Sequence, residues 1–109
     1  MSSAQPLPIA RTTDGSEIQT SPSVEILKVS TRSRPSAVAG AIAGVIRVSG
    51  VVEVQSIGAG ATNQAVKAIA IARSYLADEG VDIVCAPSFI DVAIDDEERT
   101  AMRLLIERR

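Results

Sequence analysis

The segment VVEVQSIGAG (residues 51–60), together with the helical stretch that follows it to Asp78, decides the fold. Its inner valines alternate with Glu53 and Gln55, which is the period of a strand with one buried and one polar face. Two glycines then end the strand, apolar residues recur with helical spacing, and Gly80 closes the helix. The segment is therefore a strand–helix unit whose strand has only one apolar face.

A similar unit precedes this segment, and two further strands follow it. Residues 24–30 (VEILKVS) predict a strand, and a helix with Pro35 in its first turn runs to about Val48. The last part of the chain is predicted to be mostly extended. A strand at residues 81–86 is interrupted at Pro87 and continues at residues 89–94. An acidic turn at residues 95–98 then leads to a last strand at residues 99–108. Because the second and last strands keep a polar face, we expect helices on one side of the sheet only. The predicted fold is a two-layer α+β domain of order β-α-β-α-β-β, with two helices on one face of a mixed four-stranded sheet.

Residues 1–23 differ in composition from the rest of the chain. They are rich in Ser, Thr, Pro and Gln and have no sustained hydrophobic periodicity, so we predict a disordered N-terminal tail before a domain at residues 24–109. Residues 1–17 lack the basic start and apolar stretch of a signal peptide. The apolar run at residues 37–46 is too short to span a bilayer. We therefore expect a cytoplasmic protein with no membrane partner.

The composition argues against an enzyme. The chain has no His, which removes the commonest general base and zinc ligand, and its single cysteine, Cys85, cannot form an internal disulfide. The apolar neighbours of Cys85 predict a buried structural thiol. The acidic run at residues 95–98 lacks the spaced oxygen ligands of a calcium loop. We predict a binding protein with no catalytic residues, metal or cofactor, whose small size favours self-association.

The first strand meets the first helix at residues 30–36 (STRSRPS), called the first junction below. The guanidinium groups of Arg32 and Arg34 and four hydroxyls, including that of Ser36, can converge there with free helix amides. Such a cluster suits a phosphate group. A solvated loop with an ordinary N-cap explains the same residues, so both interpretations stay open.

The second strand meets the second helix at residues 58–64 (GAGATNQ), the second junction. Gly58 and Gly60 permit close approach to a ligand, Asn63 and Gln64 carry amide donors, and Lys67 lies one turn further on. The segment matches neither the dinucleotide fingerprint nor a P-loop, and a tight turn with helix capping is the alternative. Parallel strand–helix units place both junctions at one edge of the sheet, so the two segments can form a single site.

The charge balance limits how strong such a site can be. The chain has 11 basic and 13 acidic residues, so a generic basic coat for nucleic acid is absent. A few local cations predict weak nucleic-acid binding with a shallow salt dependence, and two aromatic residues allow little base stacking. The near-neutral charge keeps open a protein-interaction or assembly module without direct nucleic-acid binding.

Several stretches resemble the stage V sporulation protein S family of bacteria. The clearest are residues 25–30 (EILKVS), 63–73 (NQAVKAIAIAR) and 97–101 (EERTA), and the resemblance covers about residues 25–109 nearly without gaps. It implies an Alba-like fold, nucleic-acid binding, commonly as a dimer, and an influence on sporulation or cell division.

The resemblance also implies three contact regions, here residues 32–36, 58–67 and 87–99. The chain departs from the Alba pattern because residues 60–64 carry no cation and the predicted hairpin tip is acidic.

Overall fold

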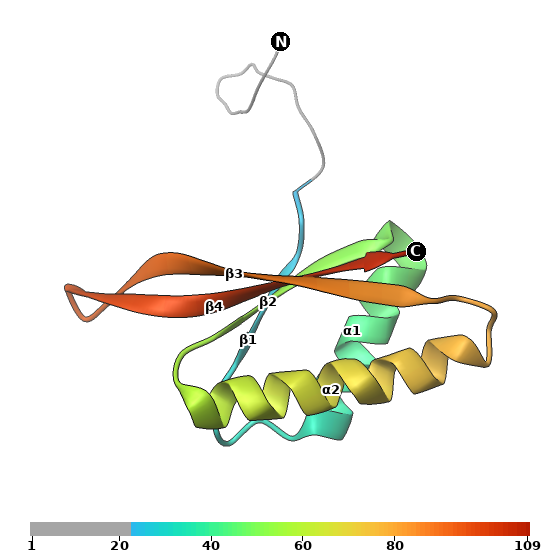
Figure 1. Cartoon of the computed structure of the whole chain (residues 1–109), viewed down its shortest axis with the longest axis horizontal. Coiled ribbons are helices and arrows are strands. Elements are labelled where there is room, and N and C mark those ends of the chain that lie inside the picture. The colour runs from blue at the N-terminus through green and yellow to red at the C-terminus, as the bar shows by residue number, and fades with distance from the viewer. Residues whose placement is uncertain (1–22) are drawn as a thin grey trace, which may run out of the picture.

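The computed structural model describes residues 23–109, which form one sheet and two helices (Figure 1). The elements in chain order are β1 (Ile26–Val29), α1 (Pro35–Ser49), β2 (Val51–Ser56), α2 (Ala59–Ala77), β3 (Ile83–Ile94) and β4 (Glu97–Arg108). This order confirms the predicted β-α-β-α-β-β arrangement. The predicted N-terminal tail, apart from Ser23, lies outside the described residues.

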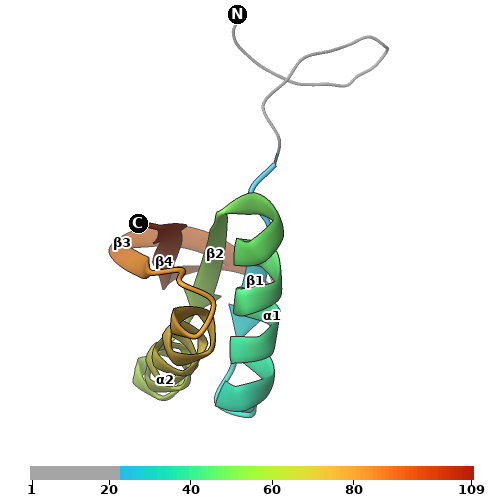
Figure 2. The same ribbon diagram turned by 90° about the vertical axis from the view of Figure 1, so that its right-hand side faces the viewer.

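The sheet is mixed and four-stranded, as predicted, with the spatial order β1-β2-β4-β3. β1 and β2 run parallel, with Val29 opposite Ser56, while the β2–β4 and β3–β4 pairs are antiparallel. Figure 2 shows α1 and α2 side by side on one face of the sheet. Within residues 23–109 the opposite face carries no helix, so this part of the chain has two layers.

The core between helices and sheet is aliphatic. α1 buries Ala39, Ile42, Ala43 and Ile46, which have the i, i+3, i+4, i+7 spacing of one helix face. α2 buries a row made mostly of alanine, namely Ala61, Ala65, Ala68, Ala72 and Leu76. The sheet contributes valine, leucine and isoleucine, including Val54 and Ile106. Alanines let the helices lie close to the strands, which suits a core with no aromatic ring.

The uncovered face of the sheet holds a polar cluster around Glu53. The side chain of Arg103 donates from Nε to Glu53 Oε1 at 2.8 Å, and Gln55 Nε2 donates to Glu53 Oε2 at 2.7 Å. Glu53 is only 7% exposed, whereas the alternating sequence pattern predicted that this face of the strand is in water. Burial raises the pKa of Glu53, but the bonds from Gln55 and Arg103 outweigh it and hold the pKa below its ordinary value.

The hairpin of β3 and β4 corrects two sequence predictions. β3 continues through Pro87, because it is an edge strand and a proline there need not break the ladder with its one neighbour. The turn is also shorter than the predicted residues 95–98. Only Asp95 and Asp96 separate the strands, with φ of 51° and 64°, as in the two-residue turns that match the twist of hairpins.

The prediction of a buried Cys85 is wrong, since the side chain is exposed. Cys85 lies on the helix side of β3, where it pairs with Ile106, but β3 is the outermost strand and α2 does not cover it. Desolvation by its neighbours nevertheless raises the pKa of the thiol, which favours the protonated form.

α1 carries small residues four positions apart, at Ser36, Gly40 and Gly44, a spacing that usually indicates close packing against another element. A methyl group added at either glycine would meet no heavy atom within 4 Å, so no described residue packs closely on this face. α1 meets the sheet and α2 through the buried row described above instead. Across residues 23–109, neither helix has the length and apolar character needed to cross a membrane.

Candidate nucleic-acid interface

The parallel pairing of β1 and β2 brings the two junctions together. Val29 and Ser56, the last residues of the two strands, are partners in the register, so both chains leave the sheet at the same level. The first junction then leads into α1 and the second into α2. This geometry confirms that the two segments share one edge of the sheet.

Two direct contacts join the junctions. The side-chain amide of Gln64 donates from Nε2 to the carbonyl oxygen of Ser33 at 3.0 Å. A methyl group at Gly60 would lie 2.9 Å from Cγ2 of Thr31, which is closer than a real side-chain contact allows. Gly60 therefore matters here for the space it leaves, because the first junction passes directly beside it.

Short hydrogen bonds fold the first junction into a tight turn. The amide of Ser30 donates to Ser33 Oγ at 2.9 Å, and the amide of Arg32 donates to Ser30 Oγ at 3.1 Å. The N-cap of α1 is Arg34, whose side chain makes no capping bond, so the hydroxyl of Ser33 serves the turn rather than the helix. Arg32, Arg34 and Ser36 are exposed. In the part of the chain that the structure describes, neither arginine forms an ion pair.

α2 begins at Ala59, so most of the second junction belongs to the first turns of this helix. Gly58 is its N-cap, with a φ of 88° that strongly favours glycine. The first helical bond runs from the amide of Thr62 to the carbonyl of Gly58 at 3.0 Å, and no side chain caps the helix. The amides of residues 59–61 therefore have no helical partner and lie at the positive end of the helix dipole.

The strand–helix half of the domain carries a local excess of positive charge. Residues 26–77 hold six cations and one acid, Glu53, whose carboxylate pairs with Arg103. The exposed cations nearest the junctions are Arg32, Arg34 and Lys67, and Asn63 is exposed beside them. A nearly neutral domain thus has an edge where guanidinium, ammonium and amide donors gather.

The hairpin opposes this charge. β2 ends opposite Met102, so residues 90–101, called the hairpin arm, project past the end of β2 (Figure 1). Residues 87–99, the third contact region implied by the resemblance, hold five acids and one cation. The arm therefore repels a polyanion, and attraction has to come from the junctions.

The predicted site residues lie around the starts of two helices and do not all have the same surroundings. Arg32 and Arg34 precede α1 and Ser36 lies in its first turn, while Gly58 and Gly60 lie at the start of α2. Gln64 is bonded to Ser33 and so positions the first junction, while Lys67 is exposed one turn further along α2. Sequence reasoning missed Thr31 and Ser33 as the partners that join the segments, because only the three-dimensional pairing reveals them. Among residues 23–109, no group of three or more His, Cys, Asp or Glu could hold a metal ion.

The fold and the paired junctions define a small two-layer α+β domain with clustered donor groups at one edge of its sheet. The model of the family described as stage V sporulation protein S (SpoVS) matches residues 25–109, and the chain belongs to this family. Membership identifies a sporulation-related protein, in a family that is not known for enzymes.

The contact between Gly60 and Thr31 makes a testable prediction about how the junctions are held. Gly40→Ala, on the open face of α1, should stabilise the protein by about 0.5–1 kcal/mol through helix propensity. Gly60→Ala should lack this gain, because its methyl group collides with Thr31, and should recover it in a Thr31→Ser background. Urea unfolding of the four variants measures the difference. An equal gain from Gly60→Ala in both backgrounds would show that the junctions do not touch.

Proposed function

We propose that this protein is a non-enzymatic, nucleic-acid-binding regulator of sporulation or cell division that holds phosphate groups between its two junctions. The observation that carries the proposal is the shared edge, where the first junction, which bears Arg32 and Arg34, contacts the start of α2 through Thr31 and Ser33. Backbone amides at a helix N-terminus and nearby guanidinium groups are the usual ligands of phosphate oxygens. DNA and RNA both present such oxygens, so the proposal covers either.

The small number of cations sets the expected strength of binding. Arg32, Arg34 and Lys67 would neutralise about three phosphates, which gives a slope of about −3 in log affinity against log salt on duplex DNA. The acidic hairpin arm lowers the affinity further. Binding of this kind is weak for a single copy and gains from two linked copies.

A second copy of the chain has a surface to occupy. Phe89 is 76% exposed and Val66 is 54% exposed, both large apolar side chains on or beside the outer strand. A cavity of about 430 Å³ between α2 and β3 is lined in part by Val66, Ala70, Val84 and Cys85. An apolar surface next to an unpaired strand edge is typical of a protein–protein contact. It supports a homodimer through α2 and β3.

The same apolar surface favours the second candidate function, a protein-interaction module without direct nucleic-acid binding. That module would use α2 and β3 to assemble, and its arginines would have no phosphate to hold. The two candidate functions differ in what they predict for substitution of the arginines of the first junction. Nucleic-acid binding should depend on these arginines only under the first candidate.

Fluorescence anisotropy with labelled duplex DNA, single-stranded DNA and RNA tests the phosphate site. We expect saturable binding that weakens with salt, and in Arg32→Ala/Arg34→Ala a lower affinity with the slope reduced to about −1. The control, Arg47→Ala/Arg73→Ala, removes the same charge from arginines paired with Glu79 and Asp82, away from the junctions. It should bind as the wild type does. If no nucleic acid binds at low salt, the interaction module is the better account.

Light scattering after size-exclusion chromatography tests the dimer. Val66→Asp/Phe89→Asp should halve the mass of the wild type, because two carboxylates cannot be buried without partners. Val48→Asp is the matched control, since Val48 is 88% exposed but lies on α1. It should leave the mass unchanged. A monomeric wild type, or a double variant that stays dimeric, contradicts this interface.

A further inference from the structure

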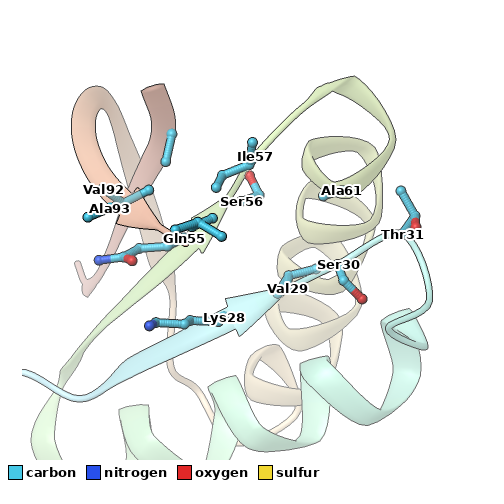
Figure 3. Close-up of a pocket in the computed structure, with 12 residues that line it drawn as sticks. Lys28, Val29, Ser30, Thr31, Gln55, Ser56, Ile57, Ala61, Val92 and Ala93 are labelled. Carbon is cyan, nitrogen blue, oxygen red and sulfur yellow. The ribbon is translucent and has the colours of Figure 1, made fainter. Parts of the chain in front are cut away.

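A cavity of about 380 Å³ lies at the ends of β1 and β2, beside the first and second junctions, and its lining includes Ala61 of α2. Residues near the ends of β1 and β2 form one side of it, and the hairpin arm forms the other (Figure 3). The proposed function uses none of its strand residues. Its volume is at the lower end of the range for small-molecule pockets.

Most of the lining is apolar. Val92 and Ile94 come from the hairpin arm, Ala101 from β4 and Ile57 from the end of β2. Ile94 is 42% exposed although it is a large aliphatic side chain, and Ala101 is buried at the base. Apolar groups that remain in contact with water in a concave site gain free energy when an apolar body covers them.

The polar part of the lining is concentrated on β1 and β2. Lys28 and Gln55 are partners in the parallel register, and Figure 3 shows their side chains extending to the same side of the two strands. Gln55 is held by its bond to Glu53, so its amide has a fixed orientation. Within the described chain, Lys28 makes no ion pair. The hydroxyl of Ser30 is already engaged in the first junction.

The charge within the lining of the cavity favours an anion. Of the described residues that line the cavity, Lys28 alone is charged. Around it, Glu53 is paired with Arg103, Arg99 lies opposite Val92, and Glu97 lies opposite Ile94 at the outer end of the arm. The other acids of the arm, Asp91, Asp95, Asp96 and Glu98, also lie outside the lining and oppose an anion. The attraction for an anion therefore comes from the ammonium group of Lys28, which forms no ion pair within residues 23–109.

We propose that this cavity binds a small amphipathic anion, with an aliphatic body against Ile57, Val92 and Ile94 and a carboxylate or phosphate head against Lys28. The fixed amide of Gln55 gives the head a second polar neighbour. The inference stands on the cavity and its charge, and it holds whether or not the junctions bind nucleic acid.

NMR titration of the full chain with hexanoate, 1-hexanol and hexylammonium tests the proposal. The three probes share an aliphatic body and differ in head-group charge. We expect shifts of the methyl signals of Ile57, Val92 and Ile94, with hexanoate binding most tightly and hexylammonium least. Lys28→Gln should weaken hexanoate binding about fivefold, to the level of hexanol, and leave hexanol unaffected. Arg47→Gln removes a positive charge from α1, outside the cavity, and should leave hexanoate binding unchanged.

A second variant tests the apolar half of the site. Ala101→Leu fills the base of the cavity and should weaken hexanoate and hexanol alike, whereas Lys28→Gln affects only the anion. The proposal is overturned if hexanoate does not shift these methyl signals in the wild type. It is equally overturned if Lys28→Gln binds hexanoate as the wild type does.

Discussion

The parallel pairing of β1 and β2 is the constraint on which the rest of the structure depends. A parallel pair needs a crossover connection, and α1 supplies it. Right-handed crossovers of this kind place the helix on one face, and α2 then returns on the same face before the hairpin completes the sheet. The pairing also sets Val29 against Ser56, so both junctions leave from one edge. A shift of this register would separate Gln64 from Ser33 and Gly60 from Thr31.

A second constraint fixes β4 against β2. Arg103 and Glu53 are diagonal neighbours on the uncovered face, and the register that joins them also puts Val54 opposite Leu104 in the core. A slip of one residue would turn Glu53 toward the helices, where no cation among the described residues is placed to meet it. Buried ion pairs contribute little net stability, so the main effect of this pair is to specify the register.

The sequence was sufficient to predict the order of elements, the two layers and the shared edge, because strand alternation, helical spacing and glycine positions are local signals. Sequence-based prediction failed where the burial or continuity of a residue depends on which other element packs beside it. Pro87 does not interrupt β3 and Cys85 is exposed, since β3 is an edge strand that no helix covers. The open face of Gly40 and the burial of Glu53 likewise depend on which elements lie nearby. In the site, arginines and glycines were recognisable by type, whereas their contacts through Thr31 and Ser33 were not.

The central claim is that nucleic acid meets the protein at the edge where the junctions lie. Backbone-amide NMR of the isotope-labelled chain, titrated with a short oligonucleotide at low salt, tests it most directly. The account predicts the largest shifts at residues 30–36 and 58–67, with small changes at the acidic tip around Asp95 and on the open face of α1. Shifts concentrated at the tip or on α1, or no shifts at all, would contradict it.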